Sequence, residues 1–241
     1  MTPSRPFLFL VPGLALLATA CATPVAPATD DPPAAAARPA SPPAAEPSPD
    51  YRLIMGELAL ARGEHSAASA QYLAAASELD DPAVARRATL IALLAADTVA
   101  AERAADRWEQ LAPHDLEAAQ YQALLHARAG RTETALQYLL RVADGATGAM
   151  IGANLQGITA LLAGEPNPWR SASLMARLAA MRPEHPEGWY GAALLAVQAD
   201  RPAQAVELAT RALALDPNLL DARFLRARAR LLVRPGQDGR D

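Results

Sequence analysis

Small residues recur at nearly fixed intervals in the alanine- and leucine-rich sequence that begins at Tyr51. The first series is Gly56, Thr89, Ala123, Gly157, Ala193 and Ala227, with intervals of 33, 34, 34, 36 and 34 residues. A second series follows 12 residues later, or 14 in the fourth case: Ala68, Ala101, Ala135, Ser171 and Ala205. Each member opens a small-x3-apolar-x2-apolar run, which is the spacing of one helix face. The pattern predicts pairs of helices with a period of about 34 residues.

Turn residues divide these predicted helices at matching places. Pro113, Pro183 and Pro217 each follow the last apolar residue of a second helix by five positions. Proline disfavours helix continuation, so it ends one unit and starts the next. Gly63 and Gly130 are expected to end first helices in the left-handed conformation. The longer offset in the fourth unit predicts a turn at residues 165–168 that is two residues longer than its equivalents.

A 34-residue period with these landmarks resembles the tetratricopeptide repeat (TPR), a helix–turn–helix unit. The resemblance covers residues 51–233, or about five repeats, and implies an all-α TPR superhelical solenoid of antiparallel helix pairs. A helical bundle without repeats is the alternative. Residues 220–233 look like a further first helix with no second helix after it. This segment is either a capping helix, which Arg223, Arg226, Arg228 and Arg230 would suit, or part of a longer array. Residues 234–241 are expected to be a flexible tail.

The N-terminal segment has the pattern of a secretory signal peptide. Arg5 precedes the short apolar run FLFLVPGLALL, and no acidic residue occurs before Asp30. Residues 17–21, Leu-Ala-Thr-Ala-Cys, resemble the lipobox of bacterial lipoproteins. The resemblance implies removal of residues 1–20, acylation of Cys21 and a lipid anchor at the periplasmic face of the outer membrane. The alternative is an ordinary signal peptide cut near the same place, with Cys21 left as a free thiol.

Residues 21–50 are expected to form a disordered tether. Alanine and proline dominate this stretch, and it has neither a helical nor a strand period. Such a composition cannot bury enough apolar surface to offset the entropy lost on ordering. The tether would hold the helical domain away from the membrane.

Composition excludes several classes of function. One cysteine allows no internal disulfide and no thiolate metal cluster. A net charge of −4 and few aromatic residues argue against a nucleic-acid surface. No nucleophile, phosphate-binding or metalloprotease motif occurs. His65, His114 and His185 are placed in turns and only His126 in a helix interior. We therefore predict a protein that is not an enzyme, with no cofactor, no metal and no small-molecule substrate.

A stacked TPR array offers a concave face lined by the first helix of each pair. The repeat phase predicts that this face carries Leu53, Glu57, Arg86, Leu90, Gln120, Leu124, Asn154, Tyr190, Leu194, Phe224 and Arg228. Its mixed apolar character favours an amphipathic helix or an extended apolar peptide as the partner. Some of these leucines could instead belong to the core between helices.

One stretch resembles a particular group of TPR lipoproteins. It runs from Gly56 to Gly63 and continues through AASAQYLAAA (67–76), DDPAVARRATLIA (80–92) and AADRWEQLAP (104–113). The group consists of outer-membrane adaptors for a periplasmic carboxyl-terminal-processing protease. The resemblance implies a scaffold that brings this protease to its cell-wall hydrolase substrates. The alternative is a pilotin that assists assembly of a type IV pilus secretin.

Overall fold

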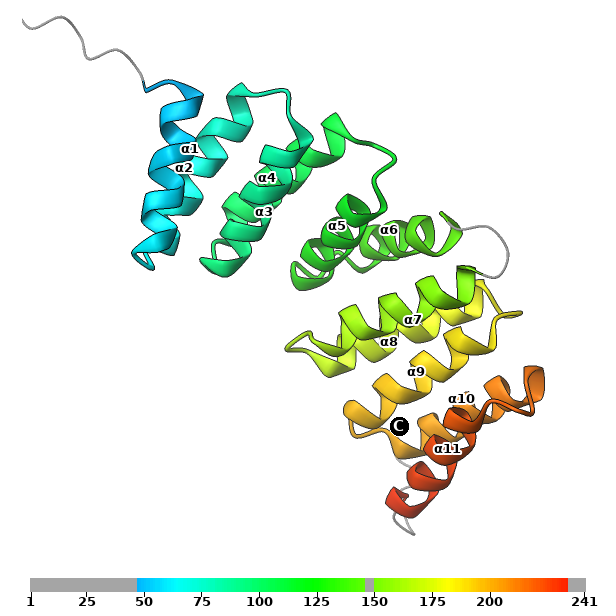
Figure 1. Cartoon of the computed structure of the whole chain (residues 1–241). Helices are drawn as coiled ribbons and strands as arrows, with labels where there is room; N and C mark the ends of the chain where they lie inside the picture. The colour runs from blue at the N-terminus through cyan, green and yellow to red at the C-terminus, as the bar shows by residue number, and fades with distance from the viewer. Residues whose placement is uncertain (1–46, 146–149, 234–241) are drawn as a thin grey trace, which may run out of the picture. The chain divides into compact units, whose positions relative to one another are not determined.

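The computed structural model describes residues 47–145 and 150–233, and every regular element in these two ranges is an α-helix. Figure 1 shows the helices following one another along the chain. They are α1 (Pro49–Ala61), α2 (His65–Glu78), α3 (Pro82–Leu94), α4 (Thr98–Leu111), α5 (Leu116–Arg128), α6 (Thr132–Asp144), α7 (Met150–Ala163), α8 (Pro168–Met181), α9 (Pro186–Gln198), α10 (Pro202–Leu215) and α11 (Leu220–Leu232).

The helices form five pairs, α1/α2 to α9/α10, and α11 packs on α10 and α9. The turn inside each pair is three or four residues long, which makes the two helices antiparallel neighbours. The small residue that opens each predicted run of a second helix is buried. The apolar residues four and seven positions after it are buried as well, in all five second helices: those that begin their runs at Ala68, Ala101, Ala135, Ser171 and Ala205. The predicted all-α TPR array is therefore confirmed, with its period set by the second helices.

The register of the fourth pair differs from the prediction. Gly157 is exposed, and a Cβ added there would meet nothing within 4 Å. Thr159 is buried instead, and its hydroxyl donates to Leu155 O at 2.8 Å, as the Thr89 hydroxyl donates to Ala85 O at 2.9 Å. Thr159 also stands 12 residues before Ser171, the offset found in every other pair. The two extra residues of the fourth repeat therefore precede Thr159 in the sequence.

The turns inside the pairs share one backbone feature. In four of the five turns, the residue seven positions after the small residue of the first helix has φ between 56° and 77°. These residues are Gly63, Ala96, Gly130 and Asp200. Glycine adopts this left-handed conformation without a steric penalty, which explains two of the four choices. Pro166 holds the equivalent position in the fourth pair, where its ring keeps φ negative. That turn has four residues instead of three, so it is one residue longer and not two as predicted.

The first helix begins at Pro49, two residues before the predicted start of the array at residue 51. The Ser48 hydroxyl accepts a hydrogen bond from Tyr51 N, and Pro49 occupies the first turn, where its missing N–H costs nothing. The remaining predictions for the chain termini lie outside the described residues. These are the signal peptide, Cys21, the tether up to residue 46 and the tail from residue 234.

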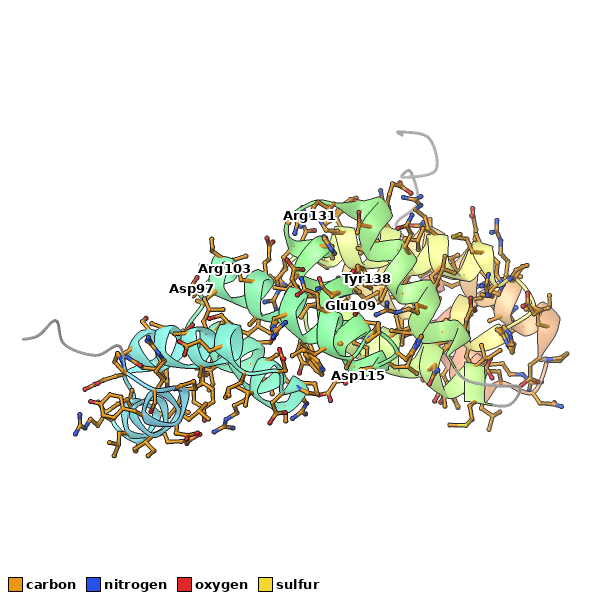
Figure 2. The ribbon with its side chains drawn as sticks, turned by 90° about the horizontal axis from the view of Figure 1, so that it is seen from above. Asp97, Arg103, Glu109, Asp115, Arg131 and Tyr138 are labelled. Atoms are coloured by element: carbon orange, nitrogen blue, oxygen red, sulfur yellow. The ribbon has the colours of Figure 1, made fainter. Side chains whose placement is uncertain are left out.

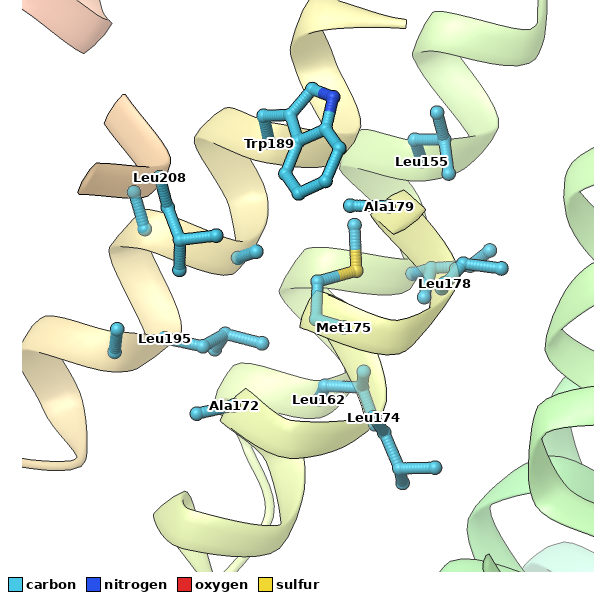
Figure 3. Close-up of a cluster of buried hydrophobic side chains, with 14 of the residues drawn as sticks. Leu155, Leu162, Ala172, Leu174, Met175, Leu178, Ala179, Trp189, Leu195 and Leu208 are labelled. Carbon is cyan, nitrogen blue, oxygen red and sulfur yellow. The ribbon is translucent and has the colours of Figure 1, made fainter. Parts of the chain in front are cut away.

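The largest core cluster extends from α5 to α11. Figure 3 shows part of it, with Met175 of α8 lying between residues of α7, α8 and α9. Leu155, Leu174 and Leu195 are fully buried around it. Alanine fills many of the other core positions, which lets the helix backbones approach closely. The core is thus built from small residues at the crossings and leucines between them.

Two glycine substitutions test the corrected register. Gly157→Ala should stabilise the protein by about 0.5–1 kcal/mol, because alanine favours a helix and its Cβ is unopposed. Gly191→Ala should destabilise it by about 1–3 kcal/mol. Its Cβ would overlap Thr159 Oγ1, which is held by its bond to Leu155 O, and would lie 3.0 Å from Met175 Cε. Urea unfolding of both variants measures the two changes, and a destabilising Gly157→Ala would contradict the register.

Candidate protein-binding face

The first helices carry an outward-facing surface, here called the first-helix face. It comprises the residues three positions before and one position after each small residue. Nine of the predicted residues occupy these positions and are at least partly exposed: Leu53, Glu57, Arg86, Leu90, Gln120, Tyr190, Leu194, Phe224 and Arg228. Leu124 occupies one as well but is only 5% exposed, so it belongs to the core. With Thr159 as the landmark, the equivalent residues of α7 are Gln156 and Ala160.

Asn154 has a structural role instead. Its side-chain amide donates to Val142 O at 2.8 Å, which attaches α7 to the last turn of α6. A carbonyl in the last turn of a helix has no partner within that helix, so this bond satisfies a group that would otherwise be open. The sequence placed Asn154 on the face because it is three residues before Gly157. The signal that identifies Gln156 was the 12-residue offset between Thr159 and Ser171.

The N-terminal half of the first-helix face is occupied by ion pairs between neighbouring repeats. Arg86 of α3 forms a bidentate pair with Glu117 of α5, with distances of 2.8 and 2.7 Å. Arg87 of α3 reaches Glu57 of α1 at 3.1 Å. Glu57 also accepts a hydrogen bond from the Tyr72 hydroxyl, which lowers the pKa of this carboxyl, and Arg87 lowers it further. Charged groups here therefore bind one another across the repeats.

The C-terminal half has a different character. A hollow of about 160 Å³ lies between α7 and α9. Its lining is mostly apolar and comes from the corrected face positions and their neighbours: Gln156, Thr159, Ala160, Ala163, Tyr190 and Leu194. Gln156 and Ala160 are exposed at its rim, and Tyr190 and Leu194 are half-buried. This site has the apolar wall and few polar groups that bind an apolar side chain of a peptide.

A second hollow, of about 270 Å³, lies where α5 meets the α7–α8 turn. Its polar groups are already engaged. Arg128 forms a bidentate pair with Glu165 at 2.8 Å, and Arg170 donates to Ala127 O at 2.7 Å and to Arg128 O at 3.1 Å. The Glu165 side chain is only 10% exposed. These contacts join the third and fourth repeats, so we assign this hollow a structural role.

The second helices are also joined by arginine pairs. Arg141 of α6 contacts both carboxylate oxygens of Glu109 of α4, at 2.5 and 2.7 Å, and lies over the Tyr138 ring. Figure 2 shows Glu109 and Tyr138 side by side on this surface, with Arg131 and Arg103 further along. Arg131 pairs with Glu102 at 2.7 Å. All 22 basic residues of the chain are arginine. Because bidentate pairing with a carboxylate suits guanidinium and not ammonium, this choice fits the pairing role.

The described residues contain no cluster of metal-binding side chains. No group of three histidine, cysteine, aspartate or glutamate side chains in residues 47–145 and 150–233 could hold a metal ion. His126 stacks on Tyr138 and accepts a hydrogen bond from Arg131 at 2.6 Å, so its ring is part of the packing. In the same part of the chain, no helix is both long enough and apolar enough to cross a bilayer.

Comparison with known proteins supports a TPR protein. No protein-family model matches the chain. The TPR repeat-containing protein PA4667 of Pseudomonas aeruginosa is 33% identical over 162 residues, which are 66% of this chain and 26% of that protein. The chain therefore spans about a quarter of the length of this relative.

Three solved structures of TPR proteins are weakly similar to this chain. YrrB, described as a TPR protein with an unusual peptide-binding site, is 15% identical, with a TM-score of 0.40 over 73% of this chain and 91% of its own. PilW, a type IV pilus biogenesis factor, is 14% identical, with a TM-score of 0.40 over 76% and 85%. TTC0263 of Thermus thermophilus is 20% identical, with a TM-score of 0.36 over 76% and 100%.

The environment of His126 predicts a pH dependence of stability. Burial lowers the pKa of this imidazole below 6.5, and the positive charge of Arg131 lowers it further. His126 therefore binds a proton more readily in the unfolded chain than in the folded protein. The free energy of unfolding should fall as the pH drops below 6.5, because protonation then favours the unfolded state. His126→Gln removes the titrating ring and keeps an acceptor for Arg131. Thermal unfolding at several pH values should show a shallower acid decline for this variant, and an equal decline would contradict the assignment.

Proposed function

We propose that the protein is a non-catalytic scaffold that binds a partner protein at the hollow between α7 and α9. The observation that carries this proposal is the contrast between the two halves of the first-helix face. Arginine–glutamate pairs occupy the half formed by α1, α3 and α5, whereas α7 and α9 present Ala160, Ala163 and Leu194 around an open hollow. An apolar side chain of a helix or extended peptide would gain about 1.5–3 kcal/mol from full burial there.

The partner proposed from the sequence resemblance is a carboxyl-terminal-processing protease together with its cell-wall hydrolase substrates. A scaffold that holds protease and substrate makes their encounter intramolecular, which raises the effective concentration without any catalytic group of its own. The sequence similarity to a bacterial TPR protein is consistent with such a role. The proposed location is the periplasmic face of the outer membrane, with Cys21 as the acylated anchor.

A matched pair of substitutions tests the hollow. Ala160→Arg places an unpaired charge at its apolar wall, and because Ala160 is exposed the fold should survive. We expect binding of the protease to weaken at least about tenfold, which corresponds to ~1.4 kcal/mol. Ala180→Arg adds the same charge at an exposed position of α8, away from the hollow, and should bind normally. Calorimetry with the purified protease measures both.

Three results would count against this function. Equal loss in the two variants would show that added charge and not the site weakens binding. Binding of a pilus secretin in place of the protease would support the pilotin alternative. Hydrolysis of a cell-wall or peptide substrate by the purified chain alone would overturn the non-catalytic assignment.

The lipid anchor has its own test. Cys21→Ser removes the thiol that would carry the acyl groups, so the protein should move from the membrane fraction to the soluble periplasmic fraction. The helical domain should keep its unfolding temperature, because all core clusters lie between residues 59 and 229. Cell fractionation at high salt separates lipid anchoring from electrostatic adhesion. A variant that stays with the outer membrane at high salt would contradict the anchor.

A further inference from the structure

Helix α11 carries two apolar stripes on opposite sides. Ala222, Leu225 and Ala229 form the inner stripe, which is buried against α9 and α10. The outer stripe is spaced i, i+4, i+7, i+11 and consists of Leu220, Phe224, Ala227 and Leu231. Leu220 is 59% exposed, Phe224 73% and Leu231 87%, so the outer stripe protrudes from the surface. A helix that merely caps the array would present a polar outer side, and this one does not.

Arginines border the outer stripe on both sides. At 3.6 residues per turn, Arg223 and Arg230 lie along one edge of the stripe and Arg228 along the other, with Arg226 further round. None of the four has a carboxylate partner among the residues that the structure describes. Asp221 is the one acidic residue of the helix, which therefore has a net charge of +3.

The rest of the array has the opposite charge. Residues 47–218 contain 14 arginines and 20 acidic residues, a net charge of −6. Nine of those arginines form ion pairs with carboxylates of the array. The other five are spread along the array, whereas the four arginines of α11 lie on one helix, next to the most exposed large apolar side chains among the described residues. An acceptor for α11 must therefore be anionic at its surface and apolar beneath it.

We propose that α11 docks on the surface of an anionic phospholipid bilayer. Phe224, Leu220 and Leu231 would enter the boundary between headgroups and acyl chains, and the flanking arginines would contact the phosphates. Long basic side chains can keep their charged ends at the headgroup level while their methylenes follow the apolar residues inward. The negatively charged remainder would be repelled from the same surface, so the array would attach by this helix and no other.

A bilayer suits this surface better than a folded protein partner does. The stripe projects outward, and the apolar hollow of the first-helix face is lined by α7 and α9 residues only. The headgroup region of a fluid bilayer can rearrange around protruding side chains, whereas a folded protein would need a complementary groove. In a symmetric dimer formed through this stripe, two α11 helices of charge +3 would face each other and repel. Docking of α11 is separate from partner binding at the α7–α9 hollow and does not depend on it.

Vesicle binding of the chain from Ala22 to Asp241 tests the proposal without the apolar N-terminal run or Cys21. This part retains every core cluster. It should co-sediment with vesicles of phosphatidylglycerol and phosphatidylcholine but not with vesicles of phosphatidylcholine alone. Binding should decline as salt shortens the Debye length to about 3 Å at 1 M. Absence of binding to the anionic vesicles at low salt would overturn the proposal.

Matched variants separate docking from a general charge effect. Arg223→Gln with Arg228→Gln should weaken vesicle partitioning roughly 25-fold, or about fivefold for each arginine. Arg62→Gln with Arg103→Gln removes the same charge from exposed sites elsewhere and should change it far less. Phe224→Ser with Leu231→Ser should abolish binding, while Ile54→Ser with Leu58→Ser on α1 should not.

Equal effects of the α11 and control pairs would overturn the proposal. So would dimerisation of the chain in sedimentation velocity that the Phe224→Ser and Leu231→Ser pair abolishes. Binding of an acidic peptide through the same arginines, with no binding to anionic vesicles, would assign α11 to a protein partner instead.

Discussion

The array depends on the close packing of each first helix on its second helix. In the first and fourth pairs this packing includes a contact between a small or β-branched residue and the side chain 16 positions later. A Cβ on Gly56 would come within 2.7 Å of Tyr72 Cδ2, and the Thr159 hydroxyl lies 3.8 Å from Met175 Sδ. This close approach brings the backbones of a pair together and sets the direction in which every other residue of the first helix points. A shift of two residues at this contact moves a different set of side chains onto the face. The identity of the binding surface therefore follows from the packing of the core.

Charge is distributed to match this architecture. Along α1 to α8, guanidinium groups link residues of neighbouring repeats. The pKa of two of the paired carboxyls is lowered, at Glu57 first by the hydrogen bond from the Tyr72 hydroxyl and at Glu133 by the hydrogen bond from Arg177. Pairs on the surface contribute little individually, but they leave few open charges on the first four repeats. The α7–α9 hollow is free of them, and α11 carries arginine without partners among the described residues. The molecule thus has three kinds of surface, each with a different capacity to bind.

The second helices were predictable because a small residue followed by apolar residues at i+4 and i+7 places all three on one face of a helix. The first helix of the fourth pair was not, since Gly157 and Thr159 both fit a series that already contains Gly56 and Thr89. Only the constant 12-residue offset distinguishes them. Pairs such as Arg86–Glu117 join residues too far apart in sequence to be inferred from spacing. The arginines of α11 suit a capping helix, but the sequence left a cap and a longer array as equal alternatives for this segment. Its outer apolar stripe was recognised only once Ala222, Leu225 and Ala229 were known to be the buried side.

Site-specific photo-crosslinking in intact cells tests the central claim most directly. A photoreactive residue at Gln156 would lie on the rim of the α7–α9 hollow, and the same residue at Asn154 would lie against α6. The account predicts capture of the carboxyl-terminal-processing protease from Gln156 and none from Asn154. Capture from Asn154 and not from Gln156 would show that the binding face follows the Gly157 register, and the structural basis for the site would be wrong.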